Sequence, residues 1–120
     1  MRVVSACLRA ICAAAIFACP AAFADATAMD AEIDFLLASV AESGCIYIRN
    51  GKEHSGEAAR DHLQMKRERG RKYYETTEEF IERIASKSSW SGKPYRIRCG
   101  DTEEDAGKWF TRALESFRKQ

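Results

Sequence analysis

The chain has 120 residues, with 19 lysines and arginines against 18 acidic residues and a formal net charge of +1. This balance gives no global basic field of the kind that recruits nucleic acid, so we expect no nucleic-acid partner. A domain of this size buries roughly 60–70% of its extended-chain surface and gains only modest stability from its core. The sequence therefore predicts a single small domain that benefits from a covalent cross-link.

The first 24 residues have the pattern of a secretory signal peptide. Arg2 and Arg9 give a positive start, residues 10–18 are apolar, and Ala22 and Ala24 suit a cleavage site. The apolar run is too short to span the roughly 30 Å hydrocarbon core of a bilayer. We expect export to the periplasm, cleavage after Ala24, and a mature chain without a transmembrane segment.

Lipid modification of Cys19 is an alternative for the same segment. Phe17 is bulky where such signals carry a small residue, and one acyl chain gives only marginal membrane binding. Simple cleavage removes Cys7, Cys12 and Cys19 and leaves two cysteines, Cys45 and Cys99. An even number of cysteines behind an export signal predicts one disulfide.

The mature part, residues 25–120, begins with a predicted frayed leader of residues 25–29 and a first helix. Asp30 can act as the N-cap, and Gly44 supplies the left-handed conformation that ends many helices. The apolar residues between them have helical spacing: Ile33, Leu36, Leu37, Val40 and Ala41. This pattern predicts one helix with a single buried stripe.

A β-hairpin is predicted next. Residues 45–49 are rich in β-branched and aromatic types, and Asn50-Gly51 is the strongest short hairpin signal, because both turn positions need positive φ. The two-residue turn predicts three cross-strand pairs: Arg49 with Lys52, Ile48 with Glu53, and Tyr47 with His54.

Three further helices are expected. Ser55 caps the second, which runs to about Gly70. Its inner face is expected to hold Ala58, Ala59, His62, Leu63 and either Met65 or Lys66. Thr76 and Glu79 form a capping box for the third helix, and Thr102 with Asp105 is expected to begin the last. The stripe of the last helix is Trp109, Phe110, Ala113, Leu114 and Phe117.

The stretch from Ser86 to Cys99 joins a polar loop to a short strand, residues 95–99. If Cys45 and Cys99 lie opposite each other on antiparallel strands, Tyr47 faces Ile97 and Arg49 faces Tyr95 on the core side. The other side then holds Ile46, Ile48, Arg96 and Arg98. We predict an α+β domain with about four helices packed on a small two- or three-stranded antiparallel sheet.

The candidate site is the hydroxyl-rich loop with its neighbouring cations. We expect a non-enzymatic binding or inhibitor-like surface for a periplasmic protein or an anionic glycan, formed by Arg49, Asn50, Ser88, Ser89, Ser91, Lys93 and Arg96. An exposed Trp90 would add a contact for a partner or a sugar. A purely structural envelope protein is another possibility.

A small hydrolase is the competing hypothesis, with a loop serine acting beside His62. The sequence has no Gly-x-Ser-x-Gly elbow, so the loop hydroxyls more simply satisfy carbonyl groups at a helix end. His54, Glu57 and His62 offer a weak metal pattern, and we expect neither a metal nor a cofactor. No catalytic residue is assigned.

The chain resembles the YfeK-like family of small exported bacterial proteins of unknown function. The matching segments are Ser43-Gly44-Cys45, Arg49-Asn50-Gly51, Ala59 with His62-Leu63, Phe80-Ile81, residues 85–95, and Trp109-Phe110. The chain departs from the family pattern at Trp90, where the family has an aliphatic residue, and at residues 52–54, where it has aromatics. The resemblance implies export and a single small domain, but no activity.

Overall fold

A computed structural model describes residues 21–120, and most of the expected signal peptide, including Cys7, Cys12 and Cys19, lies outside the described residues. The helical and β elements are α1 (Ala21–Glu42), β1 (Ile46–Arg49), β2 (Lys52–Ser55), α2 (Gly56–Arg69), β3 (Arg96–Cys99), β4 (Thr102–Asp105) and α4 (Ala106–Arg118). Three short turns lie between α2 and β3: the 3-10 turn η1 (Arg71–Tyr73), α3 (Thr77–Phe80) and the π-helical turn η2 (Ile81–Ala85).

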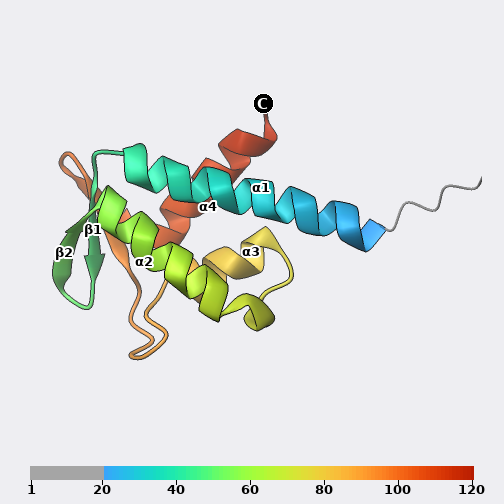
Figure 1. Cartoon of the computed structure of the whole chain (residues 1–120). Coiled ribbons are helices and arrows are strands. Elements are labelled where there is room, and N and C mark those ends of the chain that lie inside the picture. Colours follow the sequence, from blue (N-terminus) through green and yellow to red (C-terminus); the bar gives the residue numbers. More distant parts are fainter. Residues whose placement is uncertain (1–20) are drawn as a thin grey trace, which may run out of the picture.

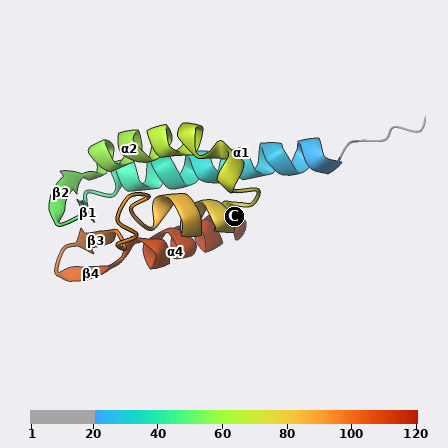
Figure 2. The same cartoon turned by 90° about the horizontal axis from the view of Figure 1, so that it is seen from below.

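An antiparallel sheet lies at one end of the packed helices (Figures 1 and 2). Its order is β2-β1-β3-β4, so two hairpins join through β1 and β3. The pairs Tyr47 with His54 and Tyr47 with Ile97 have the predicted registers, and Asn50 and Gly51 both have positive φ. The α+β prediction is therefore confirmed, with one strand more than expected.

One face of the sheet packs on the helices, and the other faces outward. Tyr47 and Ile97 are completely buried, and the Tyr47 hydroxyl donates a hydrogen bond to the carbonyl of Ala85 at 2.7 Å. On the outer face, Arg98 pairs with Glu53 at 2.9 Å. The expected alternation of core and outer residues is therefore present.

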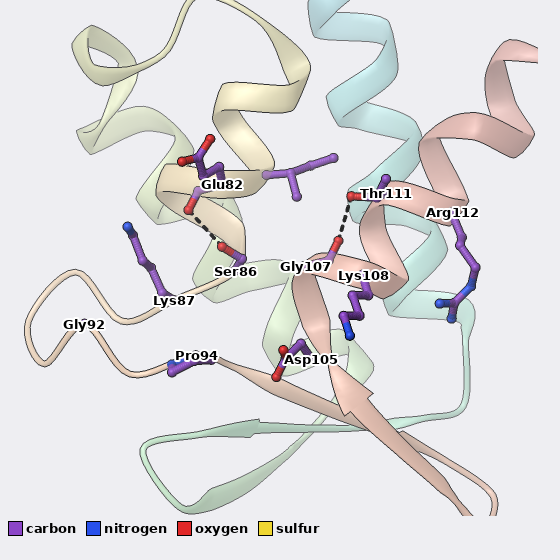
Figure 3. Close-up of a pocket in the computed structure, with 11 residues that line it drawn as sticks. Glu82, Ser86, Lys87, Gly92, Pro94, Asp105, Gly107, Lys108, Thr111 and Arg112 are labelled. Carbon is purple, nitrogen blue, oxygen red and sulfur yellow. Dashed lines mark hydrogen bonds between the residues drawn. The ribbon is translucent and has the colours of Figure 1, made fainter.

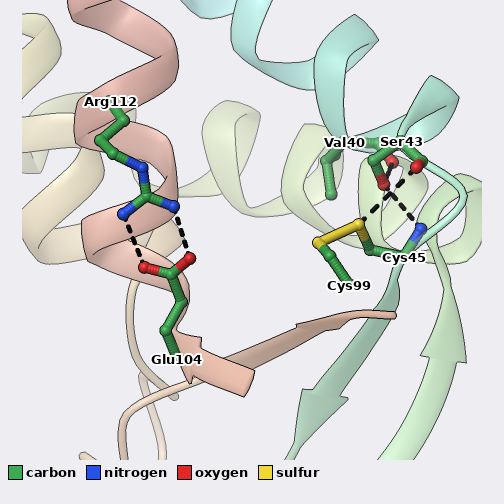
Figure 4. Close-up of a disulfide and its surroundings, with 6 residues drawn as sticks. All are labelled: Val40, Ser43, Cys45, Cys99, Glu104 and Arg112. Carbon is green, nitrogen blue, oxygen red and sulfur yellow. Dashed lines mark hydrogen bonds and ion pairs between the residues drawn. A yellow bond between two sulfur atoms is a disulfide. The ribbon is translucent and has the colours of Figure 1, made fainter. Parts of the chain in front are cut away.

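The Cys45–Cys99 disulfide joins the residue before β1 to the last residue of β3, the two central strands (Figure 4). Its Cα atoms are 4.5 Å apart, and the cysteines are separated by 54 positions in the sequence. The backbone N–H of Cys45 donates to the Ser43 hydroxyl at 3.1 Å, just after α1 ends. The predicted cross-link is confirmed.

Two predicted helix starts are wrong. Asp30 lies inside α1, which already includes residues 25–29, and its carboxylate pairs with Arg67 at 3.3 Å. Thr102 belongs to β4 and pairs with Cys99 across a turn in which Gly100 has positive φ. The order Gly-Asp lacks the strong Asn-Gly signal, which explains why the second hairpin was missed.

The cap of α2 is confirmed, but its inner face differs in part from the expected one. The Ser55 hydroxyl accepts a hydrogen bond from the Ala58 backbone N–H at 3.1 Å. Ala58 itself is exposed. Of the two alternatives for the last inward position, Lys66 is buried, with 8% of its surface exposed, and Met65 is exposed. A charged side chain therefore occupies a core position beneath the loop that precedes β3.

The fold consists of two halves with the same order of elements. A helical segment, a hairpin and a helix follow one another in α1-β1-β2-α2 and again in α3-η2-β3-β4-α4. The connections before the hairpins differ: residues 43–45 precede β1, whereas residues 86–95 precede β3. We call residues 86–95 the serine loop.

Candidate ligand-binding site

The serine loop is held by its own hydrogen bonds. The backbone N–H of Ser88 donates to the Lys93 carbonyl at 3.0 Å, and that of Tyr95 donates to the Ser86 carbonyl at 2.8 Å. The hydroxyl of Ser88 accepts from the backbone N–H of Trp90 at 3.2 Å. Because Ser88 is only 5% exposed, it organises the loop from inside.

The β1–β2 turn is bonded to this loop. The Ser91 hydroxyl donates to Asn50 Oδ1 at 2.8 Å, and Asn50 Nδ2 donates to the Ser88 hydroxyl at 3.4 Å. Trp90, between the two serines, is 94% exposed. The loop thus presents the Trp90 side chain to solvent, and several hydrogen bonds hold the segment that carries it.

Four side chains meet beneath the loop, and we call Arg49, His62, Lys66 and Tyr95 the Arg49 cluster. Arg49 Nη1 lies 3.2 Å from His62 Nε2, and the Tyr95 hydroxyl lies 3.5 Å from the same nitrogen. Lys66 Nζ donates to Tyr95 at 3.1 Å and to the carbonyl of Lys87 at 2.7 Å. Strand β1, helix α2 and the end of the serine loop all contribute to the cluster.

The charges of the Arg49 cluster follow from these contacts. Arginine can only donate, so His62 Nε2 accepts from it and Nδ1 carries the ring proton. Burial, with Arg49 and Lys66 nearby, lowers the pKa of His62 to about 4. Burial and Arg49 lower the pKa of Lys66 to about 8. At neutral pH His62 is therefore neutral, while Lys66 and Arg49 are charged.

Within residues 21–120, no carboxylate bonds to the charged groups of this cluster. Arg49 and Lys66 form no ion pair there, whereas the half-buried Arg67 of α2 meets both Asp30 and Asp34. Arg49 Nε is buried and has no hydrogen-bond partner among these residues. Buried charges are normally paired, so the cluster lacks an anion.

A cavity of about 340 Å³ lies beside the cluster, and His62 and Lys66 form part of its wall. The other lining residues are Met65, Arg69, Gly70, Tyr73, Ile84 and Ser89. The lining is mainly apolar and includes cations but no carboxylate. A basic, apolar recess therefore lies between α2, η2 and the serine loop.

A larger cavity of about 700 Å³ lies on the other side of the loop, beside the start of α4 (Figure 3). Its hydroxyls are engaged within the chain, since Ser86 donates to the Glu82 carbonyl and Thr111 to the Gly107 carbonyl, both at 2.8 Å. Its lining mixes acidic residues with basic ones. This cavity offers no comparable preference for an anion.

The residues predicted to bind a partner divide into two locations. Arg49, Asn50, Ser88, Ser89, Ser91 and Lys93 all lie at the serine loop or the β1–β2 turn that it contacts. Ser88 is buried there, whereas Ser89, Ser91 and Lys93 are exposed. Arg96 lies on the outer face of the sheet and bonds Asp105 at 2.7 Å and Glu103 at 3.2 Å. Successive side chains of a strand point to opposite faces of the sheet. Arg96 therefore lies on the face opposite to Arg49.

The sequence places Lys66 among the cations at the end of the second helix, a pattern more typical of a solvated helix end than of an anion-binding patch. The signal for burial is a lysine four positions after His62 on an otherwise apolar helix face. Because a lysine at such a position more often extends to solvent, the signal is weak. Its burial beneath Lys87 becomes apparent only when the serine loop closes over α2.

Two chemical alternatives can be compared with the geometry. Ser89 and His62 line the same cavity, but no hydrogen bond joins them in the described part of the chain. His54, Glu57 and His62 do not come together as a metal-binding group, and residues 21–120 contain no cluster of three such ligands. Among the helices of the same residues, none is both long and apolar enough to cross a membrane.

The fold and this recess define a small disulfide-linked α+β module with a cation-lined cavity. The chain belongs to the family of unknown function DUF5329, whose model matches residues 27–118. It is 39% identical over 67 residues to the uncharacterized protein YfeK of Salmonella typhimurium, and this region covers 55% of the chain and 56% of that relative. No solved structure matches the chain.

Proposed function

We propose that this protein is a non-enzymatic binding module that holds an anionic group at the Arg49 cluster. The observation that carries the proposal is the pair of charges on Arg49 and Lys66, which meet no carboxylate within residues 21–120. Burial, together with the nearby charge of Arg49, lowers the pKa of Lys66 to about 8, and a bound anion would offset the repulsion between the two cations. Binding at this position is therefore favoured electrostatically.

The serine loop supplies the second part of the site. Ser89, Ser91 and Lys93 are exposed at its outer side, where hydroxyl and ammonium groups can meet further oxygen atoms of a ligand. The hydrogen bonds within the loop fix its backbone and the Ser91 hydroxyl before binding. A pre-organised site loses less conformational entropy when the ligand binds.

We further propose that the protein is exported and works in the periplasm, with cleavage after Ala24. The disulfide suits an oxidising compartment, and Met29, a buried residue of α1, would remain in the mature protein. Intact mass measurement of the protein from a periplasmic fraction tests this: a mature chain beginning at Asp25 supports it, and an unprocessed chain contradicts it.

The binding proposal is tested by titrating the purified, oxidised protein with sodium acetate and with sodium phosphate, followed by NMR. We expect saturable shifts of the His62 ring and of the amides around Arg49. Lys66→Gln should weaken binding at least fivefold, whereas Arg98→Gln, which removes a cation from the outer face, should leave it unchanged. No saturable shift with either anion, or equal binding by both folded variants, would contradict the proposal.

A variant that leaves the core intact gives a second test. Lys93→Ala changes an exposed side chain, so it should fold like the wild type and weaken anion binding about twofold to threefold through lost Coulomb attraction. Unchanged binding in Lys93→Ala would confine the site to the buried cluster and remove the loop from it.

A small serine hydrolase is the second candidate, because Ser89 and His62 line one cavity. The geometry favours binding instead: Arg49 occupies the lone pair of His62 Nε2, and a pKa of about 4 makes His62 a weak base at neutral pH. Labelling by a fluorophosphonate probe that is lost in Ser89→Ala would favour the hydrolase over the binding module.

A further inference from the structure

The Arg49 cluster adjoins a recess with apolar walls. Met65, Tyr73 and Ile84 form these walls, while His62 and Lys66 lie at the side nearest the cluster. The volume of about 340 Å³ is at the lower end of the roughly 300–1,000 Å³ range of small-molecule sites. The recess is therefore large enough for a compact apolar group, and polar donors lie at one side of it.

Exposed hydrophobic side chains gather at the same recess. In the described part of the chain, the large hydrophobic residues that remain exposed are Met65 at 36%, Tyr73 at 56% and Trp90 at 94%. Met65 and Tyr73 line the recess, and Trp90 directly follows Ser89, which also lines it. A gathering of such side chains marks a contact site more often than isolated exposed residues do.

The charged residues that line the recess are all cationic. Lys66 and Arg69 belong to its lining, and the ammonium of Lys72 lies 5.2 Å from the centre of the Tyr73 ring. Lys66 uses two of its three N–H groups for Tyr95 and for the Lys87 carbonyl, which leaves one donor. An anionic group is therefore favoured at the recess over a neutral or cationic one.

We infer that the ligand is a small amphipathic anion, an apolar chain or ring joined to one carboxylate or phosphate group. The apolar part lies against Met65, Tyr73 and Ile84, and the charged group meets Lys66 and the Nδ1–H of His62. This inference rests on the proposed anion-binding function. It adds the class of ligand and assigns the apolar walls of the recess, which the anion-binding proposal does not use.

Three probes of related shape separate the two parts of the inference. Calorimetric titration compares sodium octanoate with sodium acetate, which lacks the apolar chain, and with octanamide, which lacks the charge. We expect octanoate to bind at least tenfold more tightly than either. Octyl phosphate and inorganic phosphate form a second pair that shows which anionic group the site prefers.

Exposed residues provide the matched variants. Met65→Ala and Tyr73→Ala should each weaken octanoate binding about threefold to tenfold and leave acetate binding unchanged. Thr111→Ala, in the lining of the larger cavity beside α4, should change neither. A melting curve for each variant checks that it is folded.

The outcomes distinguish this inference from the proposed function. Acetate binding with no gain for octanoate would overturn the amphipathic ligand and leave the anion site in place. Tight octanoate binding that weakens in Thr111→Ala, but not in Met65→Ala, would assign the ligand to the other cavity and overturn the inference. Absence of binding by both acetate and octanoate would overturn the proposed function as well.

Discussion

The two helix–hairpin–helix halves differ in what surrounds their cations. In the second half, Arg112 of α4 forms two hydrogen bonds with Glu104 of β4 (Figure 4), and Arg96 meets Asp105 and Glu103. In the first half, Arg49 and Lys66 meet no carboxylate within residues 21–120. The second half pairs these cations locally, whereas the first half pairs Arg67 with Asp30 and Asp34 but keeps Arg49 and Lys66 available for a ligand.

The connections that precede the two hairpins also differ between the halves. Residues 43–45 pass directly from α1 to β1, but the serine loop before β3 extends back over α2 of the other half. There the carbonyl of Lys87 accepts from Lys66. The longer connection of one half therefore completes the site whose cations come from the other, which shows why neither half can form the site alone.

The largest expected effect comes from the bond that joins the halves. Replacing Cys45 and Cys99 by serine should lower the free energy of unfolding by about 4 kcal/mol, because the loop that they close is long. Urea denaturation of the double variant and of the oxidised wild type measures the difference. An unchanged midpoint would show that packing between β1 and β3 holds the halves together without the cross-link.

The first residues of α2 and α4 test how similarly the halves are packed. A Cβ on Gly56 would lie 2.2 Å from the Val40 carbonyl oxygen, so Gly56→Ala should destabilise the protein by about 1–3 kcal/mol. Ala106, at the matching position, already carries a Cβ and is buried. Ala106→Gly should cost about 1 kcal/mol, chiefly through helix propensity. Equal small effects on urea midpoints would contradict the close contact at Gly56.

The Arg49 cluster should give the first half a distinctive dependence on pH. The pKa of His62 is about 4 in the folded protein and near 6.5 when unfolded, so the unfolded state binds the proton first as pH falls. The stabilising contribution of neutral His62 should be complete above pH 6.5, decrease towards pH 4 and level off below. His62→Gln should reduce the loss of stability between pH 6.5 and 4, as measured by urea denaturation.

Arg112→Gln, in the second half, is the control for this effect. It removes a cation that stays charged throughout this pH range. Its stability should run parallel to that of the wild type between about pH 6.5 and 5.5, a range above the ordinary pKa of Glu104, which Arg112 lowers. Identical profiles for the wild type and His62→Gln would contradict the assignment of His62 as a buried neutral group.

The smallest effects are expected in the serine loop. Asn50→Ala removes two hydrogen bonds between the β1–β2 turn and the loop, and should cost about 1 kcal/mol. Trp90→Ala should change the free energy of unfolding by less than about 0.5 kcal/mol, because the side chain is almost fully exposed. A larger loss for Trp90→Ala in thermal melts would show that Trp90 supports the fold rather than contacting a ligand.

The sequence determined the elements whose signals are local. Asn50-Gly51 fixed the first hairpin and its register, Ser55 fixed the start of α2, and the pair of cysteines fixed which strands lie side by side. Each of these signals depends on the φ preference of a turn, on one cap or on one bond. None requires knowledge of how the helices pack.

The tertiary structure alone decided the rest. The second hairpin lacks an Asn-Gly turn, and Arg96 differs from Arg49 because it lies on the outer face of the sheet, where β4 brings acidic residues beside it. The burial of Lys66 depends on a loop 20 residues further along the chain that closes over it. Charge pairing and desolvation are properties of neighbours in space, so residue types and local spacing could name the members of the site but could not separate the paired cations from the unpaired ones.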